Sequence, residues 1–221
     1  MNAEAYFFST GISLIDKGGP VMAILLALSV AALAIILMKL YQFWTIKLNN
    51  TNFIENSILH LSNDGPEAAL NTLENSRHPI AKVLTTTIQT SVNPSMSPTD
   101  IETEVSRVGS REIKELERYL RGLEVIANLS PLLGLLGTVL GMIKAFSKLE
   151  SAGTKVDPTI LAGGIWEALL TTAFGLSVAI PALAAFYLLE GKVENSRSLM
   201  KDSATRVISL LAKSKRNENI S

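Results

Sequence analysis

Residues 158–189 read PTILAGGIWEALLTTAFGLSVAIPALAAFYLL, and Glu167 is the only Asp, Glu, Lys, Arg or His among them. As a helix that rises about 1.5 Å per residue, this stretch would extend roughly 48 Å, which exceeds a bilayer hydrocarbon core of roughly 30 Å. The stretch therefore predicts a transmembrane helix that carries a single acid.

Glu167 would lie deep in that helix. If the hydrocarbon core begins near Pro158, the acid is about 14 Å inside, close to the midplane. An ionised carboxylate there costs on the order of 3 kcal/mol on insertion scales, so we expect the group to be neutral part of the time, or to face water or a partner. We favour a functional site; the alternative is a structural carboxyl that is hydrogen-bonded to a neighbouring helix.

Two further charge-free runs cover residues 18–38 and 125–143. The chain of 221 residues is 48% hydrophobic and 6% aromatic, and its mean hydropathy of +0.30 is too high for an ordinary soluble domain. We predict an all-α membrane protein with three transmembrane helices, the second and third of which extend into a helical cytoplasmic domain. The first run is long and ends without an Ala-x-Ala site, which disfavours a cleaved signal peptide.

The basic residues are unevenly distributed, although the formal net charge is zero. Sixteen of the twenty Lys and Arg residues fall within 39–121 or 192–216, and the other four are Lys17, Lys144, Lys148 and Lys155. The positive-inside rule then places the N-terminus and the second connection outside. The predicted segments are an outer segment 1–17, spans 18–40, 125–146 and 158–187, a cytoplasmic helical domain 41–124, an outer loop 147–157, and a cytoplasmic C-terminal helix and tail 188–221.

The predicted cytoplasmic domain reads as amphipathic helices over 53–61, 66–73 and 79–91. Ser97, Pro98 and Asp100 form an N-cap pattern that starts a further helix. Because no proline or loop cluster follows, we predict that this helix runs unbroken into the second span. Its charged face is typical of a solvated surface, and the alternative is charge pairing between subunits. Residues 193–211 repeat the amphipathic pattern.

Three threonines are predicted to lie in the membrane at depths near that of Glu167. Thr138 would lie about 9 Å from the outer end of the second span, and Thr172 about 21 Å into the third. Steps of about 5–7 Å between these groups suit a bridging water molecule, so a row of water molecules along the helices could pass a proton. Thr171 is a rival for the hydroxyl role, since it is about 40° around the helix from Glu167 and Thr172 is about 140° away. The structural alternative is that each threonine bonds its own backbone carbonyl.

Small residues recur along the second and third spans, which predicts close helix packing. They are Gly134, Gly137, Gly141, Gly164, Ala168, Gly175 and Ala179.

Other chemistries are disfavoured. The chain has no cysteine, and its two histidines, His60 and His78, lack a second ligand at metal spacing, so we expect no metal and no cofactor. There is no Gly-x-Ser-x-Gly motif and no P-loop, so we expect no enzyme and no nucleic-acid partner. A solute transporter is also disfavoured, because three spans without inverted repeats offer no alternating-access machinery. Any work must draw on an existing gradient or on a partner.

SPLLGLLGTVLG (130–141), followed by GGIWEALLTTAFGLSVAIP (163–181), closely resembles the MotA/TolQ/ExbB proton-channel family. Three spans and this length resemble the ExbB and TolQ branch, with an ExbB-like member favoured, rather than the longer, four-span MotA. The resemblance implies that Glu167 is the channel glutamate, Thr138 the threonine of Gly-Thr-x-x-Gly, and Thr172 the threonine five positions after the glutamate. Trp166 and Thr171 depart from the commoner small residues, which leaves the hydroxyl partner open.

The resemblance also implies an assembly. It implies a pentamer in the lipid bilayer of the bacterial inner membrane, with a periplasmic N-terminus and a cytoplasmic C-terminus. The second and third spans would line a pore around an ExbD- or TolR-like dimer, and proton flow would drive a TonB-like protein in outer-membrane import or a TolA-like protein in envelope maintenance. The rival hypothesis is a passive scaffold, in which Glu167 only pairs with a partner helix.

Overall fold

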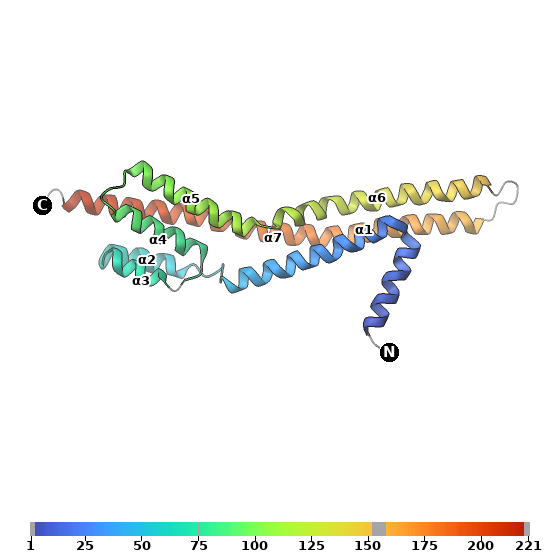
Figure 1. The fold of residues 1–221 in the computed structure, drawn as a ribbon, viewed down its shortest axis with the longest axis horizontal. Coiled ribbons are helices and arrows are strands. Elements are labelled where there is room, and N and C mark those ends of the chain that lie inside the picture. Colours follow the sequence, from blue (N-terminus) through green and yellow to red (C-terminus); the bar gives the residue numbers. More distant parts are fainter. Residues whose placement is uncertain (1–2, 75, 152–157, 219–221) are drawn as a thin grey trace. The chain divides into compact units, whose positions relative to one another are not determined.

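The computed structural model describes residues 3–74, 76–151 and 158–218, and every element within them is an α-helix. Three of the helices contain segments that are long and apolar enough to cross a membrane, so the chain is an all-α membrane protein, as the sequence predicts. In chain order the helices are α1 (Ala3–Thr45), α2 (Asn52–Asn63), α3 (Pro66–Glu74), α4 (Pro79–Val92), α5 (Pro98–Glu117), α6 (Leu120–Ser151) and α7 (Pro158–Glu218) (Figure 1).

The chain packs as two units. The span unit consists of Met1–Met38 and Tyr119–Tyr187, and the polar unit consists of Lys39–Arg118 and Leu188–Ser221. Most of α1, all of α6 and the first half of α7 therefore belong to the span unit, whereas α2 to α5 and the second half of α7 belong to the polar unit. Two unit boundaries fall close to the span ends predicted at residues 40 and 187, and the membrane limits themselves stay a prediction.

The apolar part of α1 begins at a kink. Gly19 has φ 64° and ψ −160°, a conformation that interrupts the helix and that glycine adopts without a steric penalty. Pro20 follows, and its fixed φ suits the first position of a new helix. The membrane-crossing segment Gly19–Thr45 thus starts at this kink.

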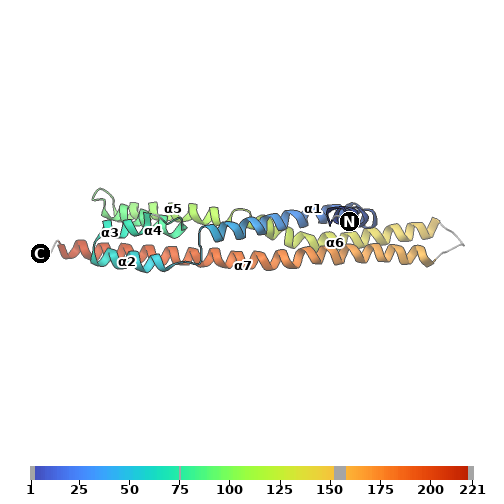
Figure 2. The same ribbon diagram turned by 90° about the horizontal axis from the view of Figure 1, so that it is seen from below.

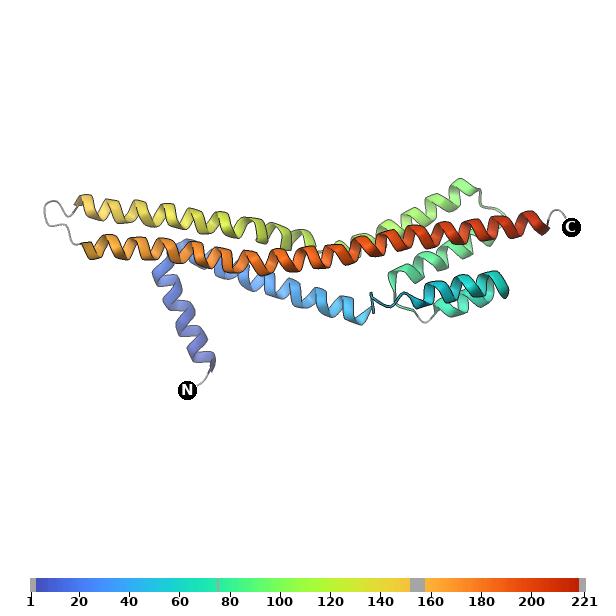
Figure 3. The same ribbon diagram turned by 180° about the vertical axis from the view of Figure 1, so that it is seen from behind.

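Glycines bring the backbones of α6 and α7 close together in the span unit. The two helices run side by side and antiparallel there (Figures 1, 2 and 3). A Cβ added at Gly175 would lie 2.6 Å from the carbonyl oxygen of Ser130, and one added at Gly137 would lie 2.5 Å from the Thr171 hydroxyl. No side chain fits at such distances, so the helices approach this closely only because these positions are glycine.

Other small residues from the predicted set lie along the same interface. A Cβ added at Gly141 would meet that of Ala168 at 3.1 Å, and one added at Gly164 would overlap Ala145. Gly134 faces the backbone of Thr171 and Thr172.

The polar unit has its own apolar core. α4 packs against α3 and α5, and α2 packs against α3. The predicted amphipathic pattern of residues 193–211 is confirmed in α7, because four of its apolar positions are buried and the other two, Ile208 and Leu211, are half-buried. Core side chains with little or no exposure include Ile80, Val83, Leu84, Ile88, Leu116, Val193, Met200, Ala204 and Val207.

The start of α5 confirms the N-cap that the sequence predicts. The Ser97 side chain accepts a hydrogen bond from the Asp100 backbone N–H, and the Asp100 carboxylate accepts one from the Ser97 backbone N–H. The Ser97 hydroxyl also donates to the Asp100 carboxylate at 2.6 Å, and this bond together with the one from the Ser97 backbone N–H holds the pKa of Asp100 below its ordinary value. Pro98 occupies the first turn, where a missing N–H has no cost.

The prediction that this helix runs unbroken into the second span is wrong. α5 ends at Glu117 and α6 begins at Leu120, because Arg118 has an extended ψ of 131° and Tyr119 has a positive φ of 68°. The break leaves carbonyl groups at the end of α5 without their helical partners. The buried Lys39 ammonium replaces one such partner by donating to the Leu116 carbonyl oxygen at 2.8 Å, and also donates to Gln42 Oε1 at 2.9 Å.

Part of the charged face of α5 is paired within the chain. Lys82 of α4 donates to both carboxylate oxygens of Glu112, and Arg197 of α7 pairs with Glu117. Arg206 of α7 donates to both carboxylate oxygens of Glu55 of α2, and this lowers the pKa of the Glu55 carboxyl. The pairs of Arg197 and Arg206 join α7 to α5 and to α2 inside the polar unit. Pairing between subunits stays an untested alternative.

His78 caps α4 from inside the polar unit. Its Nδ1 accepts a hydrogen bond from the Ile80 backbone N–H at 3.2 Å, and its Nε2 lies 3.2 Å from the Leu48 carbonyl oxygen. Only the neutral ring with its proton on Nε2 satisfies both contacts. Burial lowers the pKa of His78 below its ordinary value, although the bond to Leu48 opposes that shift.

We predict that the polar unit loses stability in mild acid. Because the folded protein resists protonating His78, the unfolded chain binds the extra proton, and the free energy of unfolding falls as the pH drops below about 6.5. The protection factors of the α4 amides in the full-length protein, which are corrected for the intrinsic exchange rate at each pH, should fall over this range. His78→Gln should remove the pH dependence, whereas His60→Gln, at an exposed histidine that pairs with Asp64, should retain it.

We also predict that one methyl group at the α6–α7 contact destabilises the span unit. Gly175→Ala places a Cβ against backbone atoms that cannot move aside, which costs about 1–3 kcal/mol. Gly163→Ala is the matched control: an added Cβ meets no atom within 4 Å there. Alanine favours a helix over glycine by about 1 kcal/mol, so the control should be at least as stable as the original chain. Equal thermal unfolding of both variants in detergent would contradict the interpretation.

Candidate functional site

The register of the α6–α7 hairpin determines which side chains meet Glu167. Gly141 lies against Ala168, and Ala145 lies against Gly164. Lys144 lies between Gly141 and Ala145 on α6, and Glu167 lies between Gly164 and Ala168 on α7. The two side chains are therefore close to each other.

Glu167 forms an ion pair with Lys144. The Lys144 ammonium donates to Glu167 Oε1 at 3.4 Å, a distance at the long end of the hydrogen-bond range. The Glu167 side chain is 26% exposed and the Lys144 side chain is 58% exposed. The acid is thus partly enclosed, and its counter-ion is the more exposed of the two side chains.

The threonine hydroxyls all donate to backbone carbonyls. Thr138 donates to Leu135 at 2.6 Å, and Thr171, which is buried, donates to Ala168 at 2.7 Å. Both bonds stay within one helix, as the structural alternative for membrane threonines expects. The Thr171 hydroxyl also lies 3.4 Å from the Gly134 carbonyl oxygen of α6. Thr172 donates to that same oxygen across the helices at 3.0 Å. Thr172 therefore ties the two helices together.

A cavity of about 530 Å³ opens beside Glu167. Its volume is enough for several water molecules or for a side chain from another molecule. The residues that line it come from α6 and α7 and include Gly141, Lys144, Ala145, Lys148, Gly164 and Glu167. The carboxylate of Glu167 thus has access to solvent or to a ligand on this side of the hairpin.

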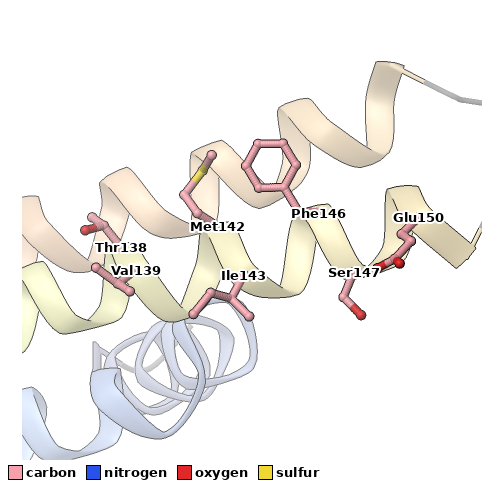
Figure 4. A pocket seen from close by; sticks show the side chains of 7 residues that line it. All are labelled: Thr138, Val139, Met142, Ile143, Phe146, Ser147 and Glu150. Atoms are coloured by element: carbon pink, nitrogen blue, oxygen red, sulfur yellow. The ribbon is translucent and has the colours of Figure 1, made fainter.

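Thr138 lies in a different groove from Glu167. That groove, of about 590 Å³, is lined along one helix, α6, by Thr138, Val139, Met142, Ile143, Phe146, Ser147 and Glu150 (Figure 4). The structure therefore brings Thr171 and Thr172 together at Gly134, brings Glu167 to Lys144, and leaves Thr138 in a groove of its own. The water-bridged chain from Thr138 to Thr172 stays a prediction.

The sequence analysis missed Lys144 as a partner of Glu167. Its bounds put Lys144 near the end of the second span and Lys148 in the outer loop, whereas α6 continues to Ser151, so both lysines are helical. A signal was present: pairing the small residues of the two spans in antiparallel order aligns Gly141 with Ala168. That alignment brings Lys144 close to Glu167.

Comparison with known proteins places these two helices in one family. The model of the MotA/TolQ/ExbB proton channel family matches residues 75–202, more than half of the chain. The biopolymer transport protein ExbB-like 3 of Synechocystis sp. is 33% identical over 168 residues, which cover 75% of this chain and 78% of that protein.

Two shorter matches are to an ExbB protein and to a TolQ protein. Biopolymer transport protein exbB1 of Vibrio cholerae is 49% identical over 70 residues, 32% of this chain and 31% of that protein. Tol-Pal system protein TolQ of Haemophilus influenzae is 43% identical over 84 residues, 38% of this chain and 36% of that protein. On the family match and on the longer match, to the ExbB-like protein of Synechocystis sp., the chain belongs to the MotA/TolQ/ExbB proton channel family.

Proposed function

We propose that this protein is a proton-conducting stator subunit that couples the proton motive force to movement of a periplasm-spanning partner. The observation that carries the proposal is Glu167, a single carboxyl within a long apolar helix that has a nearby counter-ion and opens on a cavity. Membership of a proton channel family supports the same role. In this role the chain moves protons and has no enzymatic activity.

The proposed proton step requires only a change of state at one carboxyl. A proton that arrives through the cavity neutralises Glu167, and its release on the other side restores the charge. A membrane potential supplies about 2.3 kcal/mol per charge for each 100 mV. Insertion scales give a similar cost, on the order of 3 kcal/mol, for a charged group at the bilayer centre. One proton can therefore switch the preferred state of the site.

The proposed orientation follows from the basic residues. The polar unit carries most of the Lys and Arg residues and would lie in the cytoplasm, with the N-terminus and the connection between α6 and α7 in the periplasm. The site residues would then lie in the bacterial inner membrane, with Lys144 on the periplasmic side of α6.

The proposed assembly is a homo-pentamer around a dimer of single-span partners that resemble ExbD or TolR. A partner aspartate near Glu167 would be protonated in alternation and would move the pentamer relative to the dimer. We favour the ExbB-like role, with a TonB-like protein driven in outer-membrane import, because the long match is to an ExbB-like relative. The similarity to a TolQ protein supports the second candidate, a Tol-linked motor that drives a TolA-like protein.

We predict that Glu167→Gln assembles normally but abolishes proton flux coupled to the partner. Glutamine keeps the size and a hydrogen-bonding oxygen, and it cannot bind or release a proton at this position. The measurement is proton uptake by proteoliposomes that contain the subunit with its single-span partner, alongside size-exclusion chromatography of the complex.

Glu150→Gln is the matched control, because Glu150 is an exposed acid of the same hairpin and lies outside the Glu167 cavity. This variant should conduct as the original chain does. If Glu167→Gln assembles and conducts normally, the scaffold hypothesis replaces the proton pathway.

A further inference from the structure

The cavity beside Glu167 carries an excess of positive charge. Its charged lining side chains among the described residues are Lys144 and Lys148 of α6 and Glu167 of α7. Two ammonium groups face one carboxylate, so the cavity favours an additional anionic group. A carboxylate that enters it would compete with Glu167 for the ammonium of Lys144.

The contact between Lys144 and Glu167 is a single long hydrogen bond from an exposed side chain. Lys144 is 58% exposed and reaches Glu167 through one bond of 3.4 Å. Lys39 shows the opposite arrangement: it is 1% exposed and is held by two bonds of 2.8 and 2.9 Å. A long side chain held at one point can turn away from its partner without leaving a buried charge or a cavity in a packed core.

The Lys144 ammonium interacts with Glu167 while that side chain carries a negative charge. An ammonium within about 4 Å of a carboxylate attracts that charge, and it has no such attraction to a neutral acid. A carboxylate that is held ionised does not carry protons, because carrying requires an alternation of both states. The ion pair therefore opposes proton flow for as long as it persists.

We propose that Lys144 is a removable counter-ion that blocks proton leakage through Glu167 until an acidic side chain of another protein enters the cavity. The inference rests on the proposed function. The incoming carboxylate binds the Lys144 ammonium, which stays protonated throughout. Glu167 then accepts a proton from a hydronium ion, one O–H bond forms on the carboxyl, and one water molecule is left behind. Lys144 is thus a positioning residue that acts through the protonation state of Glu167.

The first experiment measures proton leakage without any partner. Full-length protein is reconstituted into liposomes that enclose a pH-sensitive dye, and a potassium diffusion potential drives proton uptake. Lys144→Met should raise the uptake rate severalfold, since the ammonium that attracts the ionised carboxylate is gone. Lys144→Arg keeps the charge and should leak as little as the original chain. The double variant Lys144→Met/Glu167→Gln should return to the low rate, because the carrier is absent.

Arg121→Met is the matched control. Arg121 lies on the same helix, α6, is exposed, and lies outside the cavity beside Glu167. Its replacement removes one positive charge and should leave the leak unchanged. If Lys144→Met leaks no faster than Arg121→Met, the inference is overturned.

A second measurement does not depend on how the Lys144 variants fold. The infrared band of a protonated carboxyl, assigned to Glu167 by its loss in Glu167→Gln, should be absent at neutral pH in the partner-free original protein. A strong band there would overturn the inference. The proposed function fails by a different result, namely normal partner-coupled flux in Glu167→Gln, so the two failures are distinguishable.

Discussion

The backbone contact between α6 and α7 is the constraint on which the candidate site depends. Gly137 and Gly175 leave no room for a side chain, so the two helices can lie against each other only in the register that puts these positions at the contact. That register brings Lys144 to Glu167 and brings Thr172 to the Gly134 carbonyl oxygen. A shift of α7 along α6 would separate both pairs and would drive side chains into backbone atoms. The position of the acid is thus determined by steric exclusion at other places along the hairpin.

The sequence predicts the elements of this structure better than their junctions. Long apolar runs and 3.6-residue periodicity identify the helices because they depend on composition averaged over many residues. The N-cap at Ser97 is also predictable, since side chains three residues apart satisfy each other locally. The break at Tyr119 is not, because it contains no glycine or proline. The Leu116 carbonyl oxygen beside the break accepts a hydrogen bond from Lys39, which is 77 residues away in the chain.

The same distinction applies to the site. Glu167 stands out from the sequence because an isolated acid in an apolar helix is anomalous by itself. Its contact with Lys144 spans 23 residues and depends on helix register, so no local pattern reveals it. The depth of Thr138 along the helix suggested a shared path, but depth ignores direction around the helix axis. In the structure Thr138 lines a groove that does not include Glu167.

The backbone bonds of the threonines have a consequence for any file of water that passes them. Each hydroxyl has a single hydrogen, and Thr138, Thr171 and Thr172 all direct it to a carbonyl oxygen. What each oxygen then offers to a neighbouring water molecule is its lone pairs. A water molecule beside the Thr138 or Thr172 oxygen would therefore donate a hydrogen to it. Proton hopping through such a hydroxyl would first require the hydroxyl to release its carbonyl oxygen.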